Sequence, residues 1–199
     1  SIVKKVMMLF EQMAAEQHIT INSEIPDTPL YTMCAKDSVF SIVSNLMSNA
    51  VKYGDGLINV KVGMTEDRQS IIIRVESNGE IIPERDRENI FKLFFQREEA
   101  EKGVHGTGLG LPYARTLANM HNGKLYLDMS VTDMNSFVLE LPAKQEDQIV
   151  AEPAKVPEKK AKETADFDST KHTILIVEDS EEMREYLAYE LSDTYNVST

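Results

Sequence analysis

The stretch Asn45-Leu-Met-Ser-Asn-Ala-Val-Lys-Tyr-Gly54 decides how the rest of this chain is interpreted. Its two asparagines are four residues apart, so on a helix both carboxamides stand on one face, with Lys52 and Tyr53 one turn further along. Upstream, large apolar residues recur at helical spacing: Val39, Ile42, Val43, Leu46 and Met47. The pattern predicts one helix with a buried apolar side and an amide-bearing side that faces a cleft.

Two interpretations of the amide-bearing side are open. Carboxamides at Asn45 and Asn49 beside the cation Lys52 suit contact with a phosphate chain and its metal ion. Two asparagines on a helix are also often plain solvated surface, and such short patterns have a high rate of chance matches. Taken alone, the stretch favours the plain interpretation, so the other motifs of the chain have to decide.

The composition narrows the classes of partner. The chain has 199 residues, 42% of them hydrophobic, which suits one ordinary globular domain plus a further part. With 21 Lys and Arg against 33 Asp and Glu, the formal net charge is −12, so nucleic acid is not expected to bind. The single cysteine, Cys34, excludes an internal disulfide and fits a reducing, cytoplasmic compartment. No apolar run approaches the roughly 20 residues that span a bilayer, so no membrane contact by this segment is expected.

Periodicity predicts the secondary structure. Alternation of apolar and polar residues, with a period of two, predicts strands at residues 18–25, 31–34, 58–64, 69–77, 124–130 and 136–141. Helical spacing predicts helices at residues 2–17, from 37 through the asparagine stretch, from 83 to 95 and from 111 to 121. The third of these would carry Phe91, Phe94 and Phe95, and Asn122-Gly123 would close the last in a left-handed conformation. The sum is a two-layer α/β sandwich: a mixed, mostly antiparallel sheet of about five strands with about three helices on one face.

Beyond this first part the character of the chain changes. Residues 143–170 are rich in Lys, Glu, Ala and Pro and predict a flexible charged linker. Thr173-Ile-Leu-Ile-Val-Glu178-Asp179 then forms an apolar run that ends in two acids and precedes apolar residues at helical spacing. This order predicts a strand followed by a helix, the opening of an α/β unit.

A glycine run is the second strong motif. Gly106, Gly108 and Gly110 directly precede the last predicted helix of the first part. Backbone N–H groups at a helix start, free of side-chain obstruction, bind anions, although glycines also merely permit a tight turn. The run lacks the Gly-Lys-Ser/Thr ending of a P-loop and does not follow a strand, so neither that motif nor a dinucleotide-binding fingerprint fits.

The order of the motifs is more specific than any one of them. An Asn-rich helix is followed by a strand ending in Ser77-Asn78-Gly79-Glu80-Ile81-Ile82-Pro83, a Phe-rich segment and the turn Gly106-Thr-Gly-Leu-Gly-Leu111. In this order the chain resembles the catalytic, ATP-binding domain of sensor histidine kinases, within the gyrase, Hsp90 and MutL superfamily. The resemblance covers residues 1–142.

The resemblance implies roles for individual residues, with ATP and Mg²⁺ as ligands. Asn45 and Asn49 match the N box of the family, with Asn49 as the Mg²⁺ ligand, and Lys52 and Tyr53 lie near the phosphates. Asn45, Asn49 and Lys52 are the implied catalytic residues. The other implied nucleotide-binding residues are Ser77, Gly79 and Ile82 of the G1 box, Phe91 and Phe95 of the F box, and Gly106, Thr107, Gly108, Leu109 and Gly110 of the G2 box. The polar segment 96–105 would then be the lid over ATP.

Three departures from the pattern of the family stand out: Ser77 and Ile81 in the G1 box and, upstream, Ser41-Ile42 where many relatives carry His-Glu. Ser77 stands where an Asp usually accepts a hydrogen bond from the adenine amino group, and the neutral acceptor loses on the order of 1 kcal/mol. Ile81 replaces the usual second glycine of the G1 box, and its branched side chain could crowd the base. Both changes in the G1 box leave open a degenerate scaffold of the same fold that binds nucleotide weakly or not at all.

The C-terminal part has a resemblance of its own. Residues 171–199 resemble the start of a response-regulator receiver domain, in which an acidic pair, here Glu178 and Asp179, helps bind Mg²⁺. The chain begins at Ser1 and ends just after an apparent strand begins, so we expect a piece of a longer hybrid sensor kinase whose parent is membrane-anchored. Its expected partners are the upstream dimerisation helices that carry the acceptor histidine and the downstream receiver.

The activity expected from these motifs is transfer of the γ-phosphoryl group of Mg·ATP to a histidine on another domain. An ATP hydrolase or clamp of the gyrase, Hsp90 and MutL type is the third alternative, but those relatives carry a Glu base at the position of Asn45, and a carboxamide cannot take a proton from water. None of the four histidines stands in the long helix that an acceptor requires. In the family, the dimer interface lies in the same upstream dimerisation helices that carry the acceptor histidine. This chain is therefore expected to be a monomer.

Overall fold

The computed structural model describes residues 1–96, 107–144, 168, 170–179 and 181–199. The chain divides into two compact units, Ser1–Val156 and Pro157–Thr199, each of which is described by itself. Within the described residues, no helix is long and apolar enough to cross a membrane.

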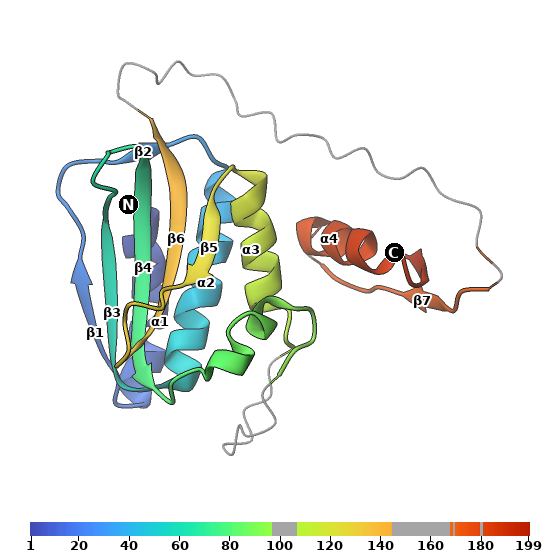
Figure 1. Ribbon diagram of the computed structural model, residues 1–199, viewed down its shortest axis with the longest axis horizontal. Coiled ribbons are helices and arrows are strands. Elements are labelled where there is room, and N and C mark those ends of the chain that lie inside the picture. The colour runs from blue at the N-terminus through green and yellow to red at the C-terminus, as the bar shows by residue number, and fades with distance from the viewer. Residues whose placement is uncertain (97–106, 145–167, 169, 180) are drawn as a thin grey trace. The chain divides into compact units, whose positions relative to one another are not determined.

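The first unit is a mixed sheet with helices on one face (Figure 1). Its described strands form one six-stranded sheet in the order β1-β3-β4-β6-β2, with β5 also paired to β6. The pair β1–β3 is parallel, and the other pairs are antiparallel. In chain order the elements are α1 (Ile2–Glu16), β1 (Thr20–Glu24), β2 (Tyr31–Thr32), α2 (Lys36–Tyr53), β3 (Gly54–Met64), β4 (Ser70–Gly79), the 3-10 turns η1 (Glu84–Asp86) and η2 (Asn89–Phe91), α3 (Gly110–Met120), β5 (Lys124–Leu127) and β6 (Asn135–Lys144). The predicted α/β sandwich is confirmed, with six strands instead of about five.

The core lies between α2 and the helix-facing side of the sheet. The apolar stripe predicted on α2 is buried, and Ile42, Leu46 and Met47 are fully inaccessible to solvent. On the sheet, Val60 lies opposite Val75, and both are buried, as the period of two predicted. The same alternation buries Ser77 on this side, where it faces the helices.

The segment after Pro83 differs from the prediction. A single helix through the phenylalanines was expected, but this segment forms the two short turns η1 and η2. Phe94 takes a left-handed conformation with φ 62°, and its N–H donates to the Gly108 carbonyl at 3.0 Å. A right-handed helix cannot continue through such a residue. The chain is already extended at Lys92, with φ −89° and ψ 146°, so the helical spacing fails before Phe94 and the left-handed residue marks the second break.

The second unit is a small β-α-β arrangement. It contains β7 (Thr173–Leu175), α4 (Glu181–Leu191) and β8 (Asn196–Ser198), and the two strands pair in parallel. The predicted strand followed by a helix is confirmed. Leu187 is buried, whereas the apolar side chains of Leu175 and Val177 are 69% and 87% exposed.

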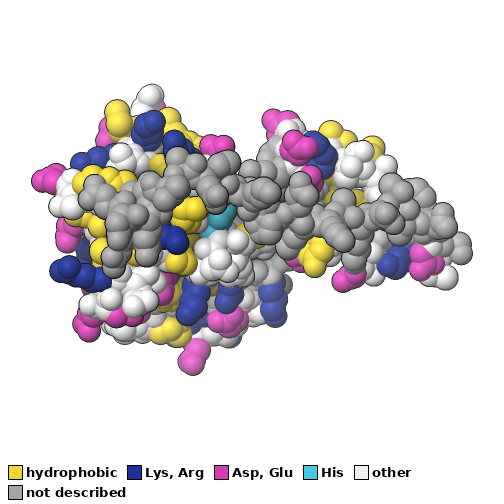
Figure 2. Space-filling model, turned by 90° about the horizontal axis from the view of Figure 1, so that it is seen from above, with side chains coloured by type: hydrophobic (Ala, Val, Ile, Leu, Met, Phe, Trp, Pro, Cys, Tyr) yellow, Lys and Arg dark blue, Asp and Glu magenta, His cyan; other side chains and the backbone are white. Residues whose placement is uncertain are grey.

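Charges are mixed over the described surface. On the face drawn in Figure 2, Lys and Arg side chains are interspersed with Asp and Glu and with apolar groups. Within the described residues, this face does not present a continuous basic field of the kind that tracks a phosphate backbone.

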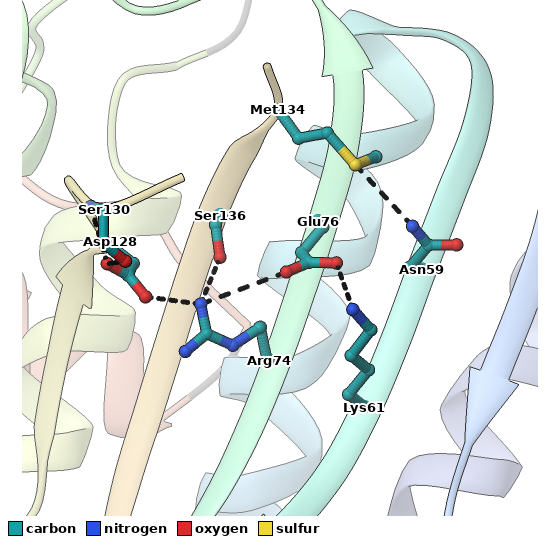
Figure 3. A network of polar contacts seen from close by, with 8 residues as sticks. All are labelled: Asn59, Lys61, Arg74, Glu76, Asp128, Ser130, Met134 and Ser136. Carbon is teal, nitrogen blue, oxygen red and sulfur yellow. Dashed lines mark hydrogen bonds and ion pairs between the residues drawn. The ribbon is translucent and has the colours of Figure 1, made fainter. Parts of the chain in front are cut away.

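The sheet face opposite the helices carries a polar network (Figure 3). The Arg74 guanidinium pairs with Asp128 and donates to the Ser136 hydroxyl at 2.8 Å, and Lys61 pairs with Glu76 at 3.0 Å. The connection from β5 to β6 passes over this face, and Asn59 on β3 donates to the Met134 sulfur at 3.6 Å. Glu76 is only 6% exposed, and its carboxylate is paired with Lys61 and Arg74.

The network makes stability depend on pH in the acid range. Hydrogen bonds from Ser130 and then from Arg74 hold the pKa of Asp128 at about 2, below its usual 3.8. A carboxyl whose folded pKa is depressed stabilises the fold above its unfolded pKa, and the contribution is lost as pH falls from about 4 to about 2.

We expect Asp128→Asn to lower the free energy of unfolding at pH 7 by about 1 kcal/mol and to flatten its dependence on pH below about 4. Urea unfolding across this range measures both effects. Asp133→Asn is the matched control, because this exposed carboxyl lies in the same loop and outside the network. Equal pH profiles for the two variants would exclude the proposed contribution.

Candidate nucleotide-binding site

The amide face of α2 meets the first residue of α3. The Asn45 amide nitrogen donates to the Ser41 carbonyl at 3.0 Å, which fixes the side chain along its own helix. A Cβ atom on Gly110 would lie 2.6 Å from the Asn45 amide oxygen, so a side chain at residue 110 would displace that carboxamide. The glycine therefore permits the close approach of the two helices at the point where α3 begins.

One turn further along α2 lies the second carboxamide. Asn49 is half-buried, and within the described residues its amide makes no hydrogen bond. Lys52 places its ammonium group 5.1 Å from the centre of the Tyr53 ring, which is 49% exposed. The amide oxygen of Asn49 is a hard donor of the kind that Mg²⁺ accepts when phosphates and waters supply its other ligands.

The end of β4 packs against the end of α2. Gly79 pairs with Gly54, and a Cβ atom on Gly79 would collide with the Tyr53 carbonyl oxygen. Ser77, two residues earlier on the same strand, is 5% exposed on the helix side. The structure thus brings the predicted residues of the N box and of the G1 box together.

The turn after β4 is held by a residue that sequence analysis missed. Asn135, the first residue of β6, is 6% exposed; it accepts a hydrogen bond from the Ile82 N–H at 2.9 Å and donates one to the Glu80 carbonyl at 3.0 Å. In the sequence it belongs to a Thr-Asp-Met-Asn turn, where an asparagine is ordinary. No pattern in the sequence distinguishes this residue, because its partners lie more than 50 positions away.

The described part of the glycine run borders the start of α3. Thr107 is exposed, and the Leu109 carbonyl accepts the Tyr113 N–H at 3.0 Å in the first turn of the helix. The Gly108 carbonyl receives the Phe94 N–H, so the chain segments on either side of residues 97–106 meet. Gly106 and nearly all of the predicted lid, residues 96–105, lie outside the described residues.

The phenylalanines of the predicted F box lie in two places: Phe94 and Phe95 lie against Gly108 before α3, and Phe91 contacts α3 and the sheet. The Phe91 ring packs edge to face on Phe137 at 6.4 Å, and the Arg115 guanidinium lies 4.5 Å from its centre. Phe91 also lines a hollow of about 280 Å³ together with Tyr126 and Met129. Phe95 is half-buried. The described contacts of Phe91 are therefore with α3 and the sheet and not with the asparagines of α2.

The arrangement suits an anion held against two helices. The first N–H groups of α3 lack partners within their own helix, and its dipole adds positive potential at the same end. Lys52 adds a formal charge, and Asn49 adds an oxygen donor. Within the described residues no group of three or more His, Cys, Asp or Glu side chains could hold a metal by itself.

The acidic pair of the second unit lies at the carboxyl end of β7. Glu178 and Asp179 follow this strand, and the Glu178 carbonyl accepts a hydrogen bond from Arg184 at 2.9 Å. Because β7 and β8 are parallel, their carboxyl ends meet at this edge of the small sheet.

Comparison with known proteins assigns the family. Residues 34–145, more than half of the chain, match the family described as histidine kinase-, DNA gyrase B- and HSP90-like ATPase. The chain therefore belongs to this family, and its fold is that of a histidine kinase catalytic domain.

The individual relatives are sensor kinases. The chain is 29% identical over 140 residues to the sensor histidine kinase WalK of Bacillus subtilis strain 168. The aligned residues make up 69% of this chain and 23% of that protein. It is 39% identical over 107 residues to the sensor histidine kinase GlrK of Escherichia coli K12, covering 53% of this chain and 22% of that protein. The solved mycobacterial sensor histidine kinase MprB superposes with a TM-score of 0.62 at 19% identity, covering 72% and 94% of the two chains. This chain thus spans less than a quarter of either curated relative.

We expect Asn49→Ala to weaken Mg·ATP binding at least about tenfold while the fold stays intact, because the substitution removes the proposed metal donor of α2. Asn49→Asp should have a similar effect, since a carboxylate replaces the amide beside the phosphates. Calorimetric titration measures the affinity, and circular dichroism measures the fold. Asn119→Ala changes an exposed helical asparagine and is the control. Unchanged affinity in both Asn49 variants would remove this residue from the site.

Proposed function

We propose that this chain binds Mg·ATP and supplies the γ-phosphoryl group to a histidine on a separate dimerisation domain in two-component signalling. The observation that carries the proposal is the pair of close approaches at α2: Gly79 at the end of β4 lies against the Tyr53 backbone, and Gly110 at the start of α3 lies against the Asn45 side chain. Family membership supports the same activity. The whole relatives are much longer than this chain, so their partner domains enter here only as part of the proposal.

The proposed roles follow the elements. Asn49 holds Mg²⁺, Asn45 fixes the start of α3 beside the phosphates, and Lys52 and Tyr53 line the phosphate chain. The bound ion would neutralise phosphate charge, and the protein would contribute mainly positioning. The base would lie against Ser77, Gly79 and Ile82, and Phe91 and Phe95 would support the wall of the site. The remaining phosphate contacts are assigned to Gly106, Thr107, Gly108, Leu109 and Gly110.

Two other functions compete with this one. An ATP hydrolase needs a general base, but residue 45 is a carboxamide already bonded to the Ser41 carbonyl. A degenerate scaffold is favoured by Ser77 in place of an acidic acceptor and by Ile81 in place of glycine. The Ile81 side chain is 38% exposed, so it is not driven into the core beneath the base.

We also propose that the parent is a membrane-anchored hybrid sensor kinase with this part in the cytoplasm. In this proposal the predicted linker, residues 143–170, begins only after β6 ends at Lys144, and residues 171–199 begin a receiver domain whose Mg²⁺ site includes Glu178 and Asp179. Exposed Leu175 and Val177 support it, because a sheet of the receiver type is covered on both faces. The acidic pair at the carboxyl end of a parallel strand gives further support.

We expect Ser77→Asp to tighten ATP binding about fivefold, because a charge-assisted hydrogen bond to the adenine amino group replaces a neutral one. GTP, which lacks that amino group at the same place, should gain nothing. Ser77→Asn is the matched neutral control. Competition titrations with both nucleotides measure the change. Equal affinity for ATP and GTP, before and after the substitution, would mean that residue 77 does not read the base.

Incubation with labelled ATP should leave this chain unlabelled, because the three histidines that the structure describes, His18, His121 and His172, lie outside its helices. Adding the separately produced dimerisation hairpin of the parent should give acid-labile phosphohistidine on that hairpin. The Asn49→Ala variant should transfer at least about tenfold more slowly. Stable acid-labile label on this chain alone would contradict the proposed division of roles.

A further inference from the structure

The turn that follows β4 is fastened by one buried carboxamide. Asn135 lies directly opposite Ser77 in the pairing of β4 with β6. Its amide nitrogen donates to the Glu80 carbonyl, and its amide oxygen accepts from the Ile82 N–H. These two backbone groups flank Ile81 on either side. Both halves of the carboxamide are therefore used on the same turn.

This pair of hydrogen bonds imitates a strand partner. In an antiparallel ladder, a neighbouring strand offers an N–H and a carbonyl to groups that flank one residue. Here the side chain of Asn135 offers the same donor and acceptor beyond the end of the ladder. Among side chains, Asn and Gln carry a donor and an acceptor side by side in one planar amide group. The identity of residue 135 is therefore closely restricted by its partners.

Ile82 is held from a second direction. The Arg87 guanidinium donates to the Ile82 carbonyl at 3.4 Å, so both backbone groups of this residue are bonded to side chains. A buried carboxamide is costly unless its polar atoms have partners, and both the oxygen and the nitrogen of Asn135 have a partner in the turn. The result is a turn of defined shape directly after the strand that carries Ser77 and Gly79.

We propose that Asn135 is a positioning residue for recognition of the nucleotide base, because it fixes the backbone that places Ile82 beside Ser77. The inference rests on the proposed function, in which Ser77, Gly79 and Ile82 contact the base. Asn135 acts on the base through the turn and not on the phosphates, which belong to α2 and the start of α3. Its loss should weaken selection among bases more than binding of a triphosphate chain.

Asn135→Asp is the sharpest test, because it keeps the shape but replaces the donor by an acceptor facing the Glu80 carbonyl. We expect the affinity for Mg·ATP to fall about tenfold and the preference for ATP over GTP to shrink by a similar factor. The affinity for magnesium tripolyphosphate, which has no base, should change less than about twofold. Asn135→Gln, which keeps both functions, should restore part of the preference.

The control is Asn59→Asp, the same substitution at an asparagine of the same sheet that bonds Asn22 and Met134 and not the backbone of residues 80–82. Figure 3 shows its contact with Met134. It should leave both affinities and the ATP preference unchanged. If Asn135→Asp does not fold, Asn135→Gln and amide exchange of Ile82 in the unaltered chain replace it. That amide should be protected, and protection should drop in the glutamine variant in step with the ATP preference.

The outcomes separate the two claims. A wild-type chain that binds neither Mg·ATP nor tripolyphosphate overturns the proposed function, and this inference falls with it. A wild-type chain that prefers ATP, with an Asn135→Asp variant that keeps this preference, overturns only the role of Asn135. If the Asn135→Asp variant loses affinity equally for ATP, GTP and tripolyphosphate, the substitution destabilises the fold in general. This result would also overturn the role of Asn135 in base recognition.

Discussion

The contact between Gly79 and the Tyr53 carbonyl is the constraint on which the rest of the site depends. Helix α2 ends at Tyr53 and strand β3 begins at Gly54, so no loop separates the helix from the strand. Gly54 then pairs with Gly79 at the end of β4. Backbone meets backbone at this corner, and the amide face of α2 is thereby set at a fixed distance from Ser77. A side chain at residue 79 would separate the two.

A second close approach completes the geometry. Gly110 lets the start of α3 reach the Asn45 carboxamide, so α2 contacts the start of α3 at Asn45 and the end of β4 at Tyr53. The three elements offer different contacts: α2 offers carboxamides and the Lys52 ammonium, the end of β4 a hydroxyl beside a glycine, and the start of α3 free N–H groups. The helix-side core, with Ile42 and Met47 fully buried, keeps these elements in register. On the opposite face, the network around Arg74 and Glu76 closes the sheet beneath them.

Local periodicity predicted most of this fold, and long-range contacts account for what it missed. Alternation placed Val60 and Val75 inward, and helical spacing identified the buried side of α2, because both signals depend on near neighbours in sequence. The left-handed Phe94 could not be foreseen, since it depends on a hydrogen bond to Gly108. The parallel pairing of β1 with β3 likewise leaves no local trace.

The candidate site was predicted in part for the same reason. Residues in compact motifs, such as Asn45 and Gly110, were found from spacing and are brought together by the fold. Asn135 was missed because its two partners lie in another segment and its own turn is chemically ordinary. Phe91 was predicted beside the nucleotide, but its described contacts are with Phe137 and Arg115, and only the folded arrangement reveals them.

Calorimetric titration of the unaltered chain with ATP, in the presence and absence of Mg²⁺, tests the central claim most directly. We predict saturable binding of one nucleotide per chain, with a dissociation constant between about 1 μM and about 1 mM, and clearly weaker binding when the metal is removed. Absence of saturable binding up to several millimolar Mg·ATP, with the chain folded, would contradict the account and favour the degenerate scaffold.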